Sequence, residues 1–286
     1  MTTPVPPAGT LFGSVEVAAR VERAERSLVE QAARGAGRRD PAERVLVLPI
    51  GSGAAVWAGP GSPFDKVVGV GMDGAFDDDE LAAVELAHDE RDAPVQFEVS
   101  TLADPEVVER LTRRGYVLVG FEHVLGLALA PARPTILADG VEVHPVGPAD
   151  VETWIGVDVE ASATPDSQGV AAHEDFPRAL VERAVRDLAT TSGFAGSLAR
   201  VGGAPAGAGS LRLHDGVAQL CGAATLPAFR RRGVQASLLS ARLATAAAAG
   251  SDLAVVTVQP GSTSQANVQR QGFGLLYARA VLSRPG

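Results

Sequence analysis

The strongest constraint on the fold is an alternation of short apolar runs with helical stretches, which is interrupted once at Pro131-Ala132-Arg133-Pro134. Short apolar runs bounded by Gly or Pro predict strands, and apolar residues recurring three and four positions apart predict helices. The mixture predicts an α/β (α+β mixed-sheet) protein. With 286 residues the chain is long enough for two cores. We therefore expect a first domain over residues 1–130, a linker over 131–140 and a second domain over 141–286.

In the first half, apolar periodicity predicts a helix from Ser14 to Arg34 that ends at Gly35 and Gly37. The other elements expected there are strands at 45–48, 54–57, 67–70, 94–99 and 116–129 and helices at 78–87 and 105–113.

In the second half, Asp215-Gly216 predicts a hairpin turn, because both central residues of such a turn need positive φ. The strand at 253–258 is expected to lie parallel to 217–226 through the helix between them. The full set of elements is strands at 141–146, 194–201, 206–213, 217–226, 253–258 and 275–282 and helices at 148–160, 176–189, 234–249 and 264–271.

The two halves also end alike. Leu111–Phe121 and Val268–Tyr277 each predict a short helix, a stop at a glycine and a strand that begins with an aromatic residue. This similarity indicates a duplicated domain, although helix-Gly-strand junctions are common in unrelated folds.

The composition excludes several classes. A formal net charge of -9 argues against general nucleic-acid binding. One cysteine, Cys221, allows no intramolecular disulfide, and five scattered histidines make a structural zinc site an unfavoured interpretation. The first residues lack a signal-peptide pattern, and no segment has the roughly 20 apolar residues of a membrane span. We expect a cytoplasmic protein with no membrane partner.

The segment from Leu226 to Leu239 joins a predicted strand to a predicted helix through Arg230-Arg231-Arg232-Gly233. The first amides of a helix have no internal acceptor, and the helix dipole is positive at that end, so an anion fits there. Gly233 allows a phosphate to approach the backbone, and the arginines add positive charge. The alternative is a solvent-exposed basic helix start, which opposes the dipole. The pattern favours a pyrophosphate site.

This segment resembles the pyrophosphate loop of the GNAT superfamily of acyl-CoA N-acyltransferases. The family pattern is Arg or Gln, two residues, Gly, one residue, then Gly or Ala. Arg230 and Gly233 match, and Gln235 departs from the last position. The resemblance extends over about residues 141–282. Together with the similar ends of the two halves, it predicts two tandem GNAT-like domains, each a mostly antiparallel sheet flanked by helices. The acidic residues Asp77–Glu80 stand where the first domain would have its pyrophosphate loop, so we expect that domain to be degenerate and non-catalytic.

The resemblance implies an N-acetyltransferase that moves an acetyl group from acetyl-CoA to a primary amine, in a small molecule or peptide, by direct attack in a ternary complex. The resemblance implies no metal, and it is compatible with a homodimer. The acetyl-CoA-binding residues implied are Ala224, Thr225, Leu226, Arg231, Arg232, Gly233, Val234, Gln235, Ala236 and Asn267.

Candidates for proton transfer are Glu174, Ser264 and Tyr277. Glu174 lies where the family places acceptor-binding elements, although such polar clusters are more often solvated loops. The family often has a Tyr four residues before the glycine of its last short helix, a position held here by Val268. Ser264 and Tyr277 are substitutes, with the simpler roles of helix N-cap and strand packing.

A second glycine-rich loop, Gly69-x-Gly71-x-x-Gly74, follows a predicted strand and matches the dinucleotide-binding fingerprint. The acidic run Asp77–Glu80 comes next; its carboxylates would repel a pyrophosphate, whereas they are good helix caps. We interpret it as a capped helix without a phosphate.

Two alternatives to acetyl transfer remain at this stage. The departures at Gln235 and Val268 leave room for an acyl-CoA-binding sensor or scaffold without turnover. A nicotinamide enzyme that uses Gly69–Gly74 is the third hypothesis.

Overall fold

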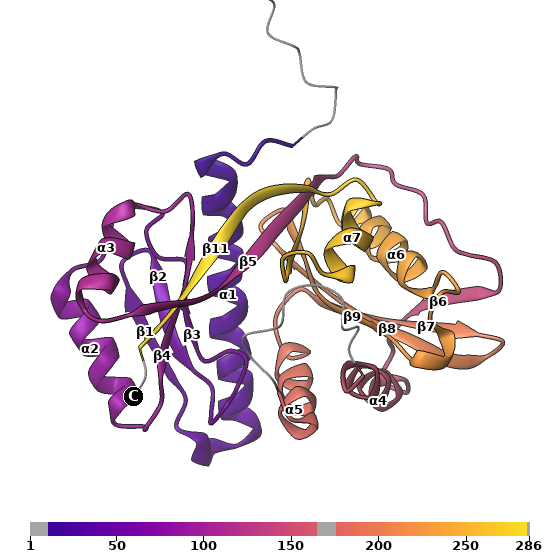
Figure 1. Ribbon diagram of the computed structural model, residues 1–286. Helices are drawn as coiled ribbons and strands as arrows, with labels where there is room; N and C mark the ends of the chain where they lie inside the picture. The colour runs from indigo at the N-terminus through magenta and orange to yellow at the C-terminus, as the bar shows by residue number, and fades with distance from the viewer. Residues whose placement is uncertain (1–10, 165–175, 285–286) are drawn as a thin grey trace, which may run out of the picture.

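The computed structural model describes residues 11–164 and 176–284. The strands of this part form one sheet in the order β1-β2-β3-β4-β11-β5-β10-β9-β8-β7-β6 (Figure 1). The strands are β1 Leu46–Ile50, β2 Gly53–Trp57, β3 Lys66–Val68, β4 Val95–Ser100, β5 Val117–Ala128, β6 Val141–Pro145, β7 Phe194–Val201, β8 Ala204–His214, β9 Val217–Thr225, β10 Leu253–Val258 and β11 Gly274–Arg284. The helices are α1 Val15–Arg39, α2 Asp78–Asp89, α3 Pro105–Arg113, α4 Val151–Ser162, α5 Arg178–Leu188, α6 Val234–Ala248 and α7 Thr263–Gln269.

Most elements lie where the sequence predicts them, and α3, β7 and β10 have the predicted bounds. The turn at Asp215-Gly216 has φ of 45° and 76°, which confirms the predicted hairpin between β8 and β9. The strands β9 and β10 are parallel, also as predicted.

The end of α1 was predicted wrongly. Gly35 and Gly37 do not stop this helix, which continues to Arg39 and ends at Asp40. A Cβ added to Gly35 would lie 2.4 Å from the hydroxyl of Thr190, just beyond α5. The glycine therefore serves close packing of α1 against the end of α5, and sequence periodicity cannot distinguish that role from a helix stop.

The two halves share their central strands. The last strand of the first half, β5, pairs with β10 of the second half, and the last strand of the chain, β11, pairs with β4 of the first half. The two also pair with each other, antiparallel, along most of their lengths. Figure 1 shows them crossing between the halves. Each half thus contributes a strand to the sheet of the other, and the division at residues 130–140 stays a prediction.

The similarity between the ends of the two halves has a structural counterpart. Gly115 after α3 and Gly272 after α7 have φ of 89° and 94°, so each glycine reverses the chain from a short helix into a central strand.

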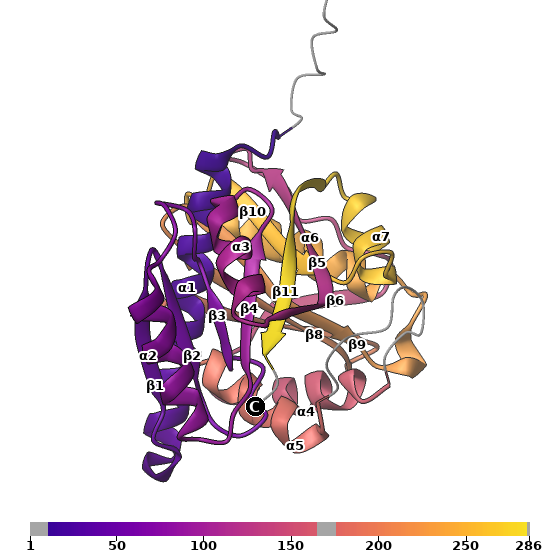
Figure 2. The same ribbon diagram turned by 60° about the vertical axis from the view of Figure 1, so that its left-hand side comes forward.

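Helices cover both faces of the sheet. In the second half, α6 and α7 pack on one face through Leu239, Leu243 and Val268, while α4 and α5 pack on the other through Trp154 and Val185. Helix α1 lies on the same side as α5, against β10 and β5 (Figures 1 and 2). Elements of both halves therefore meet between α1 and α5. No helix in the described ranges is long and apolar enough to cross a bilayer.

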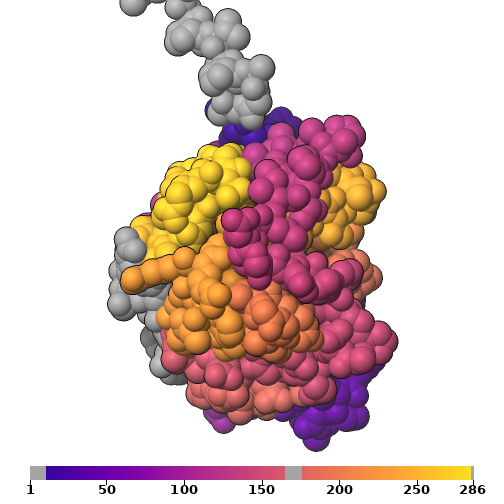
Figure 3. Space-filling model, turned by 90° about the vertical axis from the view of Figure 1, so that its right-hand side faces the viewer, coloured from indigo at the N-terminus to yellow at the C-terminus, as the bar shows by residue number. Residues whose placement is uncertain are grey.

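The predicted linker is fixed along α6. The backbone N–H groups of Ile136 and Ala138 donate to the hydroxyls of Ser240 and Ser237 at 2.7 and 2.9 Å. Figure 3 faces the second half and shows the linker as a magenta ridge across that surface.

Candidate active site

A fork between β9 and β10 forms the centre of the site. The two parallel strands pair only from Val217 to Gln219 on β9, and beyond Gln219 each pairs only with its outer neighbour. An extra residue in β9 between Gln219 and Gly222 makes a β-bulge against β8. The fork leaves the inner edge of β9, including the predicted residues Ala224 and Thr225, without a neighbouring strand in the described part of the chain.

Arg242 of α6 holds this bulge in place. Its guanidinium donates to the carbonyls of Gly222 and Ser210 at 2.7 and 3.0 Å, and these two residues form the cross-strand pair at one end of the bulge. Burial lowers the pKa of Arg242 to about 10, so the group stays charged at neutral pH.

The start of α6 lies one loop after the end of β9. Its N-cap, Gly233, has φ of 76°, and no side chain caps the first amides at Val234, Gln235 and Ala236. The first turn contains no acidic residue. A Cβ on Gly233 would lie 2.4 Å from the Cβ of Ala138 in the linker, so glycine is required here by both conformation and space.

The three arginines before α6 behave differently from one another. Arg230 is directed back to the carbonyls of Thr225 and Thr164. Arg231 has φ of 62°, and Arg232 lies over the ring of Phe229 at 5.7 Å. Leu226, before the loop, donates its N–H to the carbonyl of Ala206 at 3.0 Å. Of the three arginines, Arg231 and Arg232 are the two that do not donate to the carbonyls of Thr225 and Thr164.

The corresponding junction of the first half is different. Asp77 and Glu80 form a complete capping box at the start of α2, and Glu80 also accepts from the N–H of Gly51 at 3.0 Å. The side chain of Ser52 occupies the loop, donating to Gly69 and accepting from Met72. The predicted capped helix is confirmed, and its first turn is filled by the chain's own carboxylates.

The two predicted proton-transfer residues that the structure describes, Ser264 and Tyr277, lie in different environments. Ser264 is exposed in the first turn of α7, and its neighbour Ser262, not Ser264, is the N-cap of that helix. Tyr277 is only 4% exposed and donates its hydroxyl to Glu22 at 2.8 Å. Asn267 accepts a hydrogen bond from Arg270 of the turn that follows α7. Glu174 lies outside the described residues.

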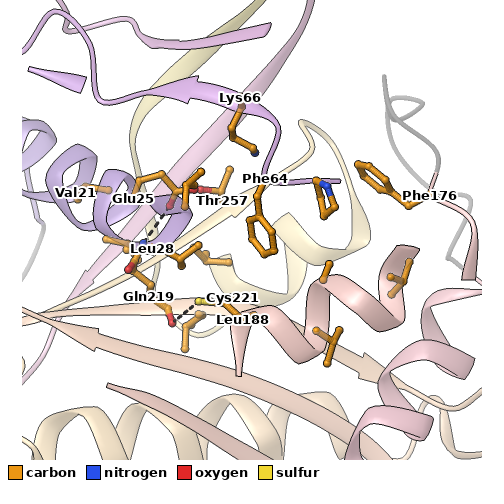
Figure 4. Close-up of a pocket in the computed structure, with 18 residues that line it drawn as sticks. Val21, Glu25, Leu28, Phe64, Lys66, Phe176, Leu188, Gln219, Cys221 and Thr257 are labelled. Carbon is orange, nitrogen blue, oxygen red and sulfur yellow. Dashed lines mark hydrogen bonds between the residues drawn. The ribbon is translucent and has the colours of Figure 1, made fainter. Parts of the chain in front are cut away.

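A cavity of about 340 Å³ opens beside the fork, on the face of the sheet that carries α1 and α5 (Figure 4). Its wall combines α1, the Pro63–Lys66 segment of the first half, α5 and both strands of the fork. Apolar side chains dominate it. The polar or ionisable groups are Glu25, Lys66, Gln219, Cys221 and Thr257. Burial raises the pKa of the Cys221 thiol to about 12, which disfavours a thiolate nucleophile.

A buried charge network continues from this cavity into the shared strands. Lys66 pairs with Glu98, and Arg279 of β11 pairs with Glu22 at 2.9 Å and contacts Glu98 at 3.5 Å. Burial disfavours the charged form of Lys66, but the carboxylates of Glu98, Glu122 and Glu25 outweigh it and raise the pKa of the amine. Burial, reinforced by the Glu98 charge, raises the pKa of Glu122 to about 7.

The sequence patterns did not predict this network. One signal was available, because Glu98 and Glu122 place carboxylates in strands that are otherwise mostly apolar. No sequence pattern indicated that residues of the first half would meet at a cavity of the second. In the described part of the chain, no group of His, Cys, Asp and Glu is arranged to hold a metal ion.

Comparison with known proteins identifies the family. Residues 159–273 match the model of the acetyltransferase (GNAT) family. The matched segment, residues 159–273, therefore belongs to the acetyltransferase (GNAT) family. The fork, the bulge and the start of α6 all lie within this matched segment, and the family match supports acyl transfer in general.

Solved structures agree on the GNAT fold. A GCN5-related N-acetyltransferase from Kribbella flavida has a TM-score of 0.67 at 18% identity, over 94% of this chain and 96% of that one. A tandem GNAT protein from the clavulanic acid biosynthesis pathway has a TM-score of 0.56 at 14% identity, over 82% of this chain and 78% of that one. None of the curated proteins matches the sequence.

Proposed function

We propose that this GNAT protein transfers an acetyl group from acetyl-CoA to a primary amine in a ternary complex. The observation that supports this most directly is the uncapped, acid-free start of α6 at the fork of β9 and β10, beside a cavity on the opposite face of the sheet. An anion and an amine can then approach the same point from different sides. Acetyl-CoA as donor also fits the predicted cytoplasmic location.

In the proposed complex, the pyrophosphate lies against the amides of Val234, Gln235 and Ala236, with Gly233 giving it room. Arg231 and Arg232 supply charge. The side chain of Gln235 points away from the phosphates. The pantetheine arm runs along the free edge of β9, from Ala224 to Leu226. These assignments use the acetyl-CoA-binding residues predicted from the sequence at the positions where the structure places them.

Acetyl transfer then takes place at the fork. The amine nitrogen attacks the thioester carbon, a C–N bond forms, and a backbone N–H of β9 stabilises the oxyanion. The C–S bond breaks, the thiolate leaves and is protonated, and the nitrogen loses its proton. We retain Ser264 as the proposed acid because it is exposed, whereas Tyr277 is already bonded to Glu22. Glu174 remains a proposed base.

The first half, in the same proposal, holds no acyl-CoA. Its junction offers carboxylates where the second half offers free amides, and Ser52 fills its loop. It acts as a degenerate lobe that completes the sheet.

One observation favours a second candidate, an acyl-CoA-binding sensor without turnover. Val268, which stands where the family often has a Tyr, is buried in the core and offers no proton donor.

Calorimetry with acetyl-CoA, followed by a thiol-release assay over a panel of amines, separates the two candidates. Binding with turnover supports acetyl transfer. Binding without turnover of any amine supports the sensor, and the absence of acetyl-CoA binding overturns both.

A further inference from the structure

We infer that the acceptor is an amine with a bulky apolar group, and that Glu25 of the first half selects it by pairing with its ammonium group. This inference rests on the proposed acetyl transfer and names its substrate class.

The walls of the cavity select for an apolar body. Leu28, Phe64, Phe176 and Leu188 surround the space, with further aliphatic side chains from α5 and the fork (Figure 4). A volume of about 340 Å³ accommodates a phenyl ring with a short alkyl chain. A polyhydroxylated amine would leave most of its hydroxyls without hydrogen-bond partners, which disfavours its binding.

Glu25 is the cavity's available anion. It accepts one hydrogen bond, from Gln219 at 3.1 Å, and no cation among the described residues lies within ion-pair distance of it. Three cations that interact with Glu25 electrostatically have other direct partners: Lys66 pairs with Glu98, Arg279 pairs with Glu22, and Arg212 donates to Gln219 and Ser27. These cations act on Glu25 at longer range, so an ammonium group from a ligand would be its direct ion-pair partner in an apolar surrounding.

The position of Glu25 suits the chemistry. Its partner Gln219 is the last residue of β9 that pairs with β10, immediately before the bulge. An amine held by Glu25 therefore has its nitrogen at the apex of the fork, where the acyl group of the proposed complex ends. The same arrangement gives the first half a function, because Glu25, Phe64 and Lys66 all belong to it.

The test uses 2-phenylethylamine as the probe and 2-phenylethanol as its neutral counterpart, on the full chain. Calorimetry measures the binding of each to the protein alone, and thiol release measures turnover of 2-phenylethylamine, ethanolamine and spermidine with acetyl-CoA. The variants are Glu25→Gln and Glu25→Asp, with Glu109→Gln on the exposed face of α3 as the control. Thermal melting verifies that each variant is folded.

We expect 2-phenylethylamine to bind and 2-phenylethanol to bind about tenfold more weakly or not at all. Glu25→Gln should raise KM for 2-phenylethylamine about tenfold with a smaller change in kcat. Glu25→Asp should show a smaller rise in KM, because it keeps the carboxylate. Glu109→Gln should have the KM of the wild type. Ala184→Phe on the α5 wall should exclude 2-phenylethylamine while acetyl-CoA still binds. The control Ala83→Phe, on the exposed face of α2, should bind both compounds like the wild type.

Preferred turnover of ethanolamine or spermidine, or an unchanged KM in folded Glu25→Gln, would overturn the inference and leave acetyl transfer intact. Binding of 2-phenylethylamine together with absent turnover would instead overturn the acetyl transfer while retaining the amine site. Absence of both amine and acetyl-CoA binding overturns the two together.

Discussion

The two strand-to-helix junctions, β3 to α2 and β9 to α6, occupy corresponding places in the two halves and differ in what satisfies the first amides of the helix. At α2 the chain supplies Asp77 and Glu80. At α6 it supplies a glycine in the left-handed region and no carboxylate. One junction is satisfied by its own side chains, and the other leaves its first amides without a side-chain cap, as the proposed anion site requires. Similar backbones thus acquire opposite electrostatic properties from a few residues.

The largest expected effect tests whether the halves are independent copies. Residues 1–130 and 131–286 expressed separately should each fail to unfold cooperatively, because each then lacks a strand from the middle of its sheet. Co-expression should restore one folded complex. Thermal melts and size-exclusion chromatography measure this. A cooperative melt of either piece alone would show that the exchange of β5 and β11 is dispensable.

The next prediction concerns the glycines of the two junctions. Gly233→Ala and Gly74→Ala both place a Cβ at positive φ, but only the first brings it into contact, 2.4 Å from Ala138. Because overpacking costs about 1–3 kcal/mol, Gly233→Ala should melt about 5 °C below Gly74→Ala. It should also weaken acetyl-CoA binding about tenfold, as measured by calorimetry. Equal effects of the two substitutions would contradict the contact with the linker.

A third experiment converts one junction toward the other. Gln235→Glu with Ala236→Glu gives α6 an acidic first turn like that of α2. Each carboxylate opposes a bound phosphate, so acetyl-CoA affinity should fall about tenfold at low salt and less at high salt. Glu182→Gln on α5, away from the α6 junction, serves as the control for an altered surface charge. Unchanged acetyl-CoA affinity in the double variant would place the pyrophosphate elsewhere.

The smallest expected effect concerns the network that joins the halves. The pKa of Glu122 is about 7 in the folded protein, above the ordinary glutamate value of 4.5, so the folded state binds this proton more tightly. Its contribution to stability is full below about pH 4.5 and is lost as the pH rises through 7. Glu122→Gln removes that loss, because its amide stays neutral at every pH.

The melting temperature of Glu122→Gln relative to the wild type should therefore rise by a few degrees between pH 5 and pH 8. Glu109→Gln should show no such trend. A constant difference across this range would mean that Glu122 is already ionised at pH 5.

The sequence predicted the local structure well and the meeting of distant segments poorly. The α6 junction was predictable because Arg230–Gly233 and the flanking apolar runs are contiguous, and the capping of α2 because Asp77 and Glu80 are three residues apart. The hairpin at Asp215-Gly216 was predictable for the same reason. By contrast, Gly35 was misinterpreted because its partner Thr190 lies on a distant segment.

By itself the sequence determined the elements, their order and the chemistry of one loop, since hydrophobic periodicity and turn residues act over a few positions. Only the tertiary structure decided that β5 pairs with β10 and β11 with β4, each in the other half. It also decided that Glu25 and Lys66 line the cavity at the fork, and that the hydroxyl of Tyr277 donates to Glu22. These outcomes depend on which strand edges remain unpaired once the halves fold together. That is a property of the whole sheet, and no single segment encodes it.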